Sequence, residues 1–257
     1  MTGTLLVSVL LGLAIGVLLG LLGGGGSILA VPALVYGAGL PLSAAVPTSL
    51  LVVGISSATA VIPRLRQVQW RLAAVFGGSG AIAAFGGAAV NRLLDPTVVL
   101  VGFAVLMIAA GVRMLTNQSE GGGSCALPTG GVHWQSCLPK AIGAGLVVGF
   151  LTGLFGVGGG FLIIPALVLL LGLAMPQAVA TSLIIIVVNS ASGFIAHLGD
   201  AHLEAAVAIP FTLAAIAGSL GAGRFASRLP ASKLRRWFAY LVFAVAAFVI
   251  YRALTAA

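Results

Sequence analysis

Apolar runs of membrane-spanning length follow one another along almost the whole chain of 257 residues, and charged residues stand in the short connections between them. Only 6 % of the residues are charged, whereas a water-soluble protein needs about a quarter to cover its surface. A bilayer offers no water to satisfy an open backbone, so runs of about 20 apolar residues must form helices. The sequence therefore predicts an all-α polytopic membrane protein.

Glycine, proline and charged residues divide the apolar sequence into ten segments, five in each half. The segments of the first half are residues 5–22, 27–39, 42–62, 72–90 and 98–115, and those of the second half are 141–155, 161–173, 177–198, 205–222 and 234–254. We therefore expect a first transmembrane repeat at residues 1–116, a Gly/Ser-rich linker at 117–139 and a second transmembrane repeat at 140–257.

The two halves repeat one another in sequence. Residues 12–50 align without a gap with residues 145–183, at a constant offset of 133, and about half of the positions are identical. Self-similarity at a fixed offset is the signature of a duplicated structural unit. The chain is thus expected to contain two copies of one fold.

Charge indicates how the two copies are oriented. The connection after the third segment carries three arginines and no acid in the first half (64–71), but two acids, two histidines and no Lys or Arg in the second half (197–204). After the fourth segment the contrast reverses, with five basic residues at 224–236. Because basic loops face the cytoplasm, equivalent loops should lie on opposite sides, which predicts inverted topology with both termini outside and the linker in the cytosol. The net charge of +8 follows from these loops and indicates membrane topology rather than nucleic-acid binding.

The second segment of each half is too short for an ordinary span. Residues 27–39 and 161–173 would form about 20 Å of helix at 1.5 Å per residue, and each follows a glycine cluster. We expect each to be a broken or re-entrant helix that packs against its predecessor as a hairpin.

A broken helix exposes amide groups and the positive end of its dipole, which together form an anion site without any charged side chain. If the copies are inverted, the two hairpins enter from opposite faces and their helix starts should meet near the midplane. Hydroxyl and amide groups nearby would add donors for an oxyanion. The candidate substrate-binding residues are Gly23, Gly24, Gly25, Gly26, Ser27, Thr48, Ser49, Gly156, Gly158, Gly159, Gly160, Thr181, Ser182 and Asn189.

Two alternatives apply to these candidates. The glycines of the breaks could serve only the close packing of helices, and the hydroxyls could bond back to carbonyls of their own helices. Helix packing is the expected role of the four-residue ladder Gly12, Gly16 and Gly20 and of its copy at 145–153.

The linker region holds both cysteines of the chain, Cys125 and Cys137. A disulfide, or half a metal site with His133, is conceivable, but two cysteines and one histidine at loose spacing are weak evidence for zinc. We expect two free thiols, because the cytosol is reducing.

The acidic residues give no proton relay inside the membrane. Asp95, Glu120, Asp200 and Glu204 all fall in connections or at segment ends. His197 together with Asp200 could sense protons, although a solvated loop pair is the simpler expectation. The chain could therefore be a facilitator or channel, or a proton could travel with the substrate. Enzyme motifs are also missing from the sequence, so we expect neither catalysis nor a cofactor.

The doubled glycine-proline pattern resembles a known family. Residues 20–32 and 153–165, the Ala-Thr-Ser at 180–182 and the basic region 223–230 resemble the TauE/SafE family of sulfite and sulfonate exporters. The resemblance implies a multi-pass permease of the bacterial plasma membrane that exports small sulfur-containing anions. A passive anion channel, another small anion as substrate, proton coupling and a homodimer stay open.

Overall fold

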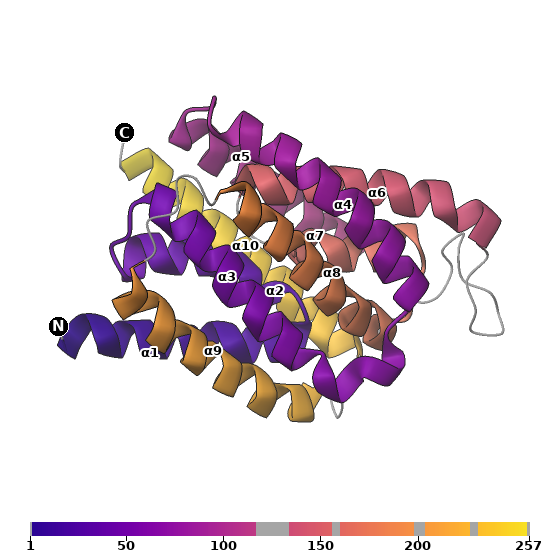
Figure 1. The fold of residues 1–257 in the computed structure, drawn as a ribbon, viewed down its shortest axis with the longest axis horizontal. Helices are drawn as coiled ribbons and strands as arrows, with labels where there is room; N and C mark the ends of the chain where they lie inside the picture. The colour runs from indigo at the N-terminus through magenta and orange to yellow at the C-terminus, as the bar shows by residue number, and fades with distance from the viewer. Residues whose placement is uncertain (1, 117–133, 156–159, 198–203, 227–230, 256–257) are drawn as a thin grey trace.

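The structure is a computed structural model that describes residues 2–116, 134–155, 160–197, 204–226 and 231–255. Every regular element in these residues is helical (Figure 1). The first half contains α1 (Thr2–Leu22), α2 (Gly25–Pro32), η1 (Ala33–Gly37), α3 (Leu42–Ala60), η2 (Ile62–Gln67), α4 (Trp70–Asn91) and α5 (Pro96–Thr116). The second half contains α6 (Trp134–Phe155), α7 (Gly160–Pro165), η3 (Ala166–Leu170), α8 (Met175–Ala196), α9 (Ala205–Ala226) and α10 (Ala231–Thr255).

Length and composition suit several of these helices to a bilayer. Among the described residues, five spans are long and apolar enough to cross it: Ser43–Ala60, Trp70–Asn91, Cys137–Phe155, Met175–Ala196 and Ala205–Gly223. Large apolar side chains such as Leu6, Ile82 and Ile209 are exposed on the outside of the bundle, where lipid tails would cover them. The predicted all-α polytopic membrane fold is confirmed.

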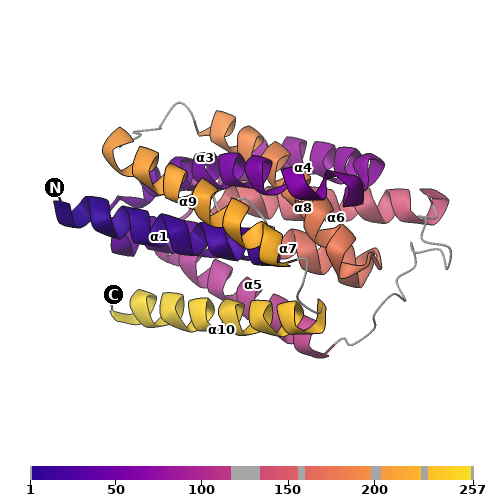
Figure 2. The ribbon, with the colours of Figure 1, turned by 90° about the horizontal axis from the view of Figure 1, so that it is seen from below.

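The glycine ladder of α1 packs against α9 of the other half. Gly12 lies against the backbone of Phe211, and Gly20 lies two turns later against Ser219. The partner numbers rise in step, so α1 and α9 run parallel (Figure 2). A Cβ on Gly16 would overlap the backbone of Ala215, which confirms the predicted packing role of the ladder.

The copy of this ladder makes the reciprocal contact. Gly145 of α6 lies against Phe76 of α4, and Gly153 lies against Ala84. Helices α4 and α6 therefore also run parallel, with backbones in close contact.

Helices α3 and α8 form the centre of the bundle and pack on each other. Their spans are 67 % and 61 % buried, against 39 % or less for α4, α6 and α9. Leu50 in the middle of α3 lies against Gly193 near the end of α8. Leu183 clusters instead with Ala60 at the end of α3, so these two helices cross antiparallel.

The first short helix folds back on α1 as a hairpin. Gly23 ends α1 with a left-handed backbone (φ +70°), and α2 starts two residues later. The chain then turns back along α1, because Gly26 lies against the carbonyl oxygen of Ile15 and the side chain of Leu19. The break of the second copy, residues 156–159, lies outside the described residues.

Both short helices widen into π-helical turns after a proline. Pro32 and Pro165 lack the amide that would continue the α-helical ladder, and η1 and η3 follow them directly. Two residues after each turn stands a glycine with positive φ, Gly39 (+74°) and Gly172 (+72°). The two copies thus share their local geometry as well as their sequence.

The beginning of α1 and the end of α10 lie at the same end of the bundle in both views (Figures 1 and 2).

Candidate functional site

The two short helices touch where they begin. Gly24 is the N-cap of α2, and Gly160 is the first residue of α7. A Cβ on Gly24 would overlap the carbonyl oxygen of Gly160, and a Cβ on Gly160 would lie 2.7 Å from the Ser27 hydroxyl oxygen. Ser27, Gly24 and Gly160 are all buried. The predicted meeting of the two helix starts is therefore present in the fold.

The first amide groups of α2 have no preceding helical turn whose carbonyls could accept their hydrogen bonds. The Gly24 carbonyl accepts the amide of Ser27 at 3.3 Å and its hydroxyl at 2.7 Å. The amides of Gly25 and Gly26 have no carbonyl one turn back within α2 and lie at the positive end of its dipole. Gly26 also touches α1, so the packing alternative accounts for that glycine as well.

The predicted hydroxyls of the first copy bond back to their own helix. Thr48 donates to the carbonyl of Ala44 at 2.7 Å, and Ser49 donates to that of Val46 at 2.8 Å. Both side chains are buried. Because both hydroxyl protons are engaged in hydrogen bonds within α3, these two side chains could only accept a hydrogen bond from a ligand in this arrangement.

The equivalent hydroxyls of the second copy, unlike those of the first, also bond to groups outside their own helix. Ser182 donates to Val179 at 2.9 Å and also approaches the carbonyl of Gly23 at 3.4 Å, which ties α8 to the first break. Thr181 instead accepts the amide of Gln69 at 3.0 Å. Of the two, only Ser182 lies next to the meeting point of the breaks.

Asn189 packs against α4. It follows Ser182 by seven residues, or about 10 Å along α8, and faces Gly80 of α4 at the place where Gly145 of α6 also approaches. Both its side-chain nitrogen and its side-chain oxygen are buried and without a hydrogen-bond partner among the described residues. Asn189 also follows by one turn Ile186, whose Cδ1 lies beside Gly160 of the second break. Gly156, Gly158 and Gly159 lie outside the described residues.

Asn189 belongs to a set of buried polar groups that the sequence analysis only partly identified. The hydroxyls of Ser56, Ser57 and Ser190 are likewise fully buried and without a partner among the described residues. The offset of 133 that relates the halves pairs Ser56 with Asn189 and Ser57 with Ser190. Each unpaired buried group costs about 1–3 kcal/mol, so four at equivalent positions on the central helices call for a functional explanation.

Arg64 is buried, although the sequence analysis treated it only as part of a basic loop. It sits in η2, just after α3, and its Nη2 donates to the carbonyl of Gly20 at 2.7 Å and to that of Gly223 at 3.4 Å. Nη1 is buried and has no partner among the described residues. Burial lowers the pKa of the Arg64 guanidinium, yet arginine stays charged in proteins.

His197 is buried too, so the expectation of a solvated position is wrong for this residue. Its Nδ1 lies 2.8 Å from the carbonyl oxygen of Gly193. A carbonyl only accepts, so Nδ1 carries a proton there. Nε2 is buried without a partner among the described residues. Asp200, with which it was paired in the prediction, lies outside them.

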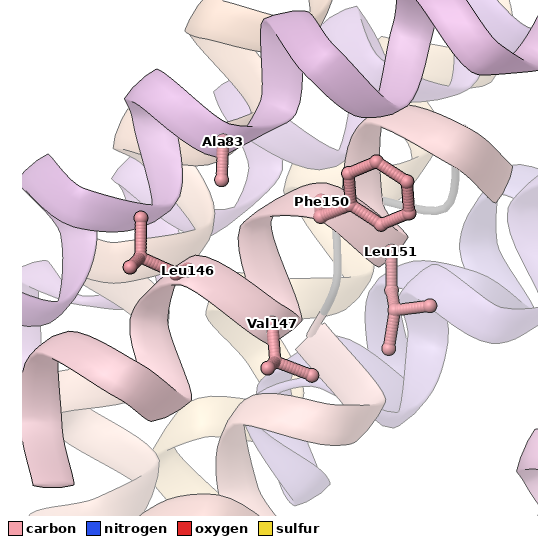
Figure 3. A pocket seen from close by; sticks show the side chains of 5 residues that line it. All are labelled: Ala83, Leu146, Val147, Phe150 and Leu151. Carbon is pink, nitrogen blue, oxygen red and sulfur yellow. The ribbon is translucent and has the colours of Figure 1, made fainter.

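A groove between α4 and α6 has a different chemistry. Five apolar side chains line it: Ala83, Leu146, Val147, Phe150 and Leu151 (Figure 3). It lies on the outside of the bundle and offers no charged or hydrogen-bonding side chain in this lining. The groove suits a lipid chain rather than an anion.

The family model described as "Sulfite exporter TauE/SafE" matches residues 8–249 of the chain. The chain belongs to the TauE/SafE family. This TauE/SafE chain is 34 % identical to a "Probable membrane transporter protein" of Xylella fastidiosa, over 97 % of this chain and 96 % of that one. It is 31 % identical to the "Probable membrane transporter protein YunE" of Bacillus subtilis, over 84 % of this chain and 86 % of that one. No solved structure matches it.

Membership of the TauE/SafE family identifies the protein as a membrane transporter and not an enzyme. It is a multi-pass integral protein of the bacterial inner membrane, as predicted. Asp95 and Glu204, the two acids within the described residues, lie in the connections before α5 and before α9.

Cys137 contradicts the expectation of free thiols, because it is disulfide-bonded in the structure of this TauE/SafE member. The other cysteine of the chain, Cys125, lies outside the described residues, as does His133. No cluster of three metal-binding side chains occurs among the residues that the structure describes.

Proposed function

We propose that the protein exports a small sulfur-containing oxyanion, of the sulfite or organosulfonate class, which binds where the two glycine breaks meet. The contact between Gly24 and Gly160 carries this proposal. It brings the starts of two short helices, one from each half, to the same buried place. Helix starts bind oxyanions through backbone amides, and a glycine has no side chain to keep the ion away.

The two halves are taken to be inverted repeats, with residues 1–116 and 140–257 as the units. In an inverted pair, the fourth helix of one copy runs in the same direction as the first helix of the other copy. The third helices of the two copies run in opposite directions. The parallel pairs α1–α9 and α4–α6 and the antiparallel pair α3–α8 support this topology. Inverted repeats are the usual basis of alternating access around a central site.

The orientation follows from the basic loops. Arg64, Arg66 and Arg71 would face the cytosol together with the basic region 224–236 and the linker. Both termini would then lie outside, which agrees with the common end of the bundle where α1 begins and α10 ends.

The polar groups on α3 and α8 would complete the path. Ser56, Ser57, Asn189 and Ser190 can replace part of an ion's hydration shell as it passes the crossing of these helices. None of them has a hydrogen-bond partner among the described residues, which supports this role. They carry no charge, and each can donate a hydrogen bond to an anion.

Transport into or out of vesicles tests the proposal directly. Proteoliposomes loaded with sulfite should release it much faster than protein-free liposomes of the same lipid, and an organosulfonate should compete. Equal release from both preparations for sulfite, organosulfonates and sulfate would contradict the proposal.

A passive anion channel is the second candidate, because neither acid within the described residues lies inside a spanning helix. Accumulation of sulfite against its gradient when a proton gradient is imposed would exclude the channel. Flux that only follows the electrochemical gradient of the anion, with single-channel currents, would support it.

A further inference from the structure

Arg64 and His197 occupy equivalent positions in the two copies. The offset of 133 extends past the central helices, where Ser57 matches Ser190 and Leu65 matches Leu198. It pairs Arg64 with His197 in the connections that follow α3 and α8. Each of these two residues buries a side-chain nitrogen that has no partner among the described residues. Because these two buried nitrogens stand at equivalent positions, one in each half, we look for a role that both residues share.

We propose that Arg64 and His197 are paired substrate ligands at the two mouths of the anion path, each offering a buried nitrogen to the oxyanion on opposite sides of the membrane. This inference rests on the proposed function. It adds the residues that receive the anion before and after it occupies the glycine breaks.

Arg64 has no acid to neutralise it within the described residues. Glu204 precedes α9, whereas Arg64 contacts Gly223 near the other end of that helix, about 28 Å away at 1.5 Å per residue. Asp95 follows α4, whereas Arg64 precedes it, so a helix of 22 residues separates them. A buried charge without a counter-ion is costly, and a substrate anion would supply that counter-ion through a charge-assisted hydrogen bond to Nη1.

The position of Arg64 also leads to the proposed site. Its Nη2 is held by Gly20, three residues before the left-handed Gly23 at the first break. The guanidinium therefore sits on the last turn of α1, beside the hairpin tip. An anion released from Nη1 would have the amides that follow Gly24 as its next donors.

His197 offers the anion a ring nitrogen, Nε2, in place of a guanidinium nitrogen. Its Nδ1–H is committed to Gly193, so Nε2 of the neutral ring can only accept, for example from the hydroxyl of a protonated oxyanion. The protonated ring can donate to the anion itself. Two charged residues lie at this end of α4: Arg92, whose Nη2 donates to the Ala196 carbonyl at 2.9 Å, and the acid Asp95 three residues later. The two mouths thus offer different nitrogen ligands, a guanidinium at one and an imidazole at the other.

Binding measurements on the purified protein distinguish a substrate-binding role of Arg64 from a structural role, in which it would only cap the carbonyls of Gly20 and Gly223. Sulfite should raise the thermal unfolding temperature of the wild type, because a ligand that binds the native state stabilises it. Arg64→Gln should weaken the apparent sulfite affinity at least tenfold. Arg66→Gln is the matched control, since Arg66 lies in the same turn but is exposed, and it should bind sulfite like the wild type.

A second variant tests the inference if Arg64→Gln does not fold. Arg64→Lys retains the charge but replaces the planar, two-armed guanidinium with a single ammonium centre on a shorter reach, so it should fold and bind sulfite several-fold more weakly. His197→Leu should likewise weaken sulfite binding, with Arg66→Gln again unchanged.

Wild-type sulfite affinity in folded Arg64→Lys or Arg64→Gln would overturn the inference, as would wild-type affinity in His197→Leu. If the wild type transports sulfite while these variants are unaffected, the inference alone fails. If the wild type transports nothing, the proposed function fails.

Discussion

Ser27 and Gly160 occupy equivalent positions of the two copies, and they lie in contact: a Cβ on Gly160 would stand 2.7 Å from the Ser27 hydroxyl oxygen. Equivalent residues of two related units touch only near the axis that relates them. On the proposed inverted topology, the contact places the pseudo-twofold axis at the starts of α2 and α7. It also shows that the axis is imperfect, because only one of the two positions carries a hydroxyl.

Gly160→Ala should reduce sulfite flux at least tenfold with little change in the amount of folded protein. The added Cβ would press on the Ser27 hydroxyl and on Ile186 Cδ1, at 2.7 and 2.8 Å, and so separate the two helix starts. Flux in proteoliposomes measures the effect. Gly78→Ala is the control, since nothing lies within 4 Å of its Cβ position. Equal flux in both variants would mean that the contact has no part in transport.

Exchanging the two residues gives a second test of the axis. The double variant Ser27→Gly, Gly160→Ser moves the hydroxyl to the equivalent position of the other copy. We expect it to transport better than Gly160→Ser alone, because the clash with the Ser27 side chain is removed. Flux that is no better than in the single variant would argue against the coupling of these two positions.

Glycines of the helix ladder should behave differently from those of the break. Gly16→Ala places a methyl group on the backbone of Ala215, and we expect a loss of several kcal/mol of stability, as for overpacked contacts. Denaturation in detergent measures it. Gly143→Ala, where nothing lies within 4 Å of the Cβ position, should leave stability unchanged. An unaffected Gly16→Ala protein would show that α1 and α9 are not in backbone contact.

Asn189→Leu should keep or raise stability and still lower transport. Replacing an unpartnered buried amide by an apolar group of similar size removes a penalty of about 1–3 kcal/mol, whereas a group that solvates the passing ion is lost. Unfolding and flux are measured on the same preparation. Ser192→Ala, on the same helix but only half-buried, should change neither. A large loss of stability in Asn189→Leu would instead indicate a structural role.

The cysteines report the orientation of the linker. The disulfide at Cys137 and a cytosolic linker make opposite predictions, because the reducing cytosol does not preserve disulfides. If the linker faces the cytosol, both cysteines must be reduced in cells. A membrane-permeant maleimide should then label Cys125 and Cys137 in intact cells without added reductant, and an impermeant reagent should not. Labelling by the impermeant reagent, or only after reduction, would reverse the proposed topology.

The helical architecture could be predicted from the sequence because the order of apolar residues and glycines alone decides which segments form helices. Apolar runs dictated helices, and a segment of about 13 residues after a glycine cluster could only be a broken helix, which α2 and its π-helical continuation confirm. The meeting of the helix starts followed from the combination of repeat and charge. Boundaries were less certain: α6 begins at Trp134, inside the stretch assigned to the linker.

Side-chain environments were harder to predict than segments. Arg64 stands among three loop arginines, and nothing in its neighbourhood in the sequence shows that it turns inward to the carbonyl of Gly20. Ser56 and Ser57 were missed because a serine in an apolar run gives no sign of whether its hydroxyl bonds back to its own helix, as that of Thr48 does, or stays without a partner. The direction of the Thr48 hydroxyl depends on a rotamer, which packing decides.

The central claim is that an anion binds between the starts of α2 and α7. The most direct measurement is an experimental structure of the protein with selenite, a heavier analogue of sulfite, at a concentration that competes with sulfite transport. The account predicts density for one anion beside the amides of Gly25 and Gly26, within reach of Gly160. An ion bound elsewhere along the path in a transport-competent protein, with this place empty, would contradict it.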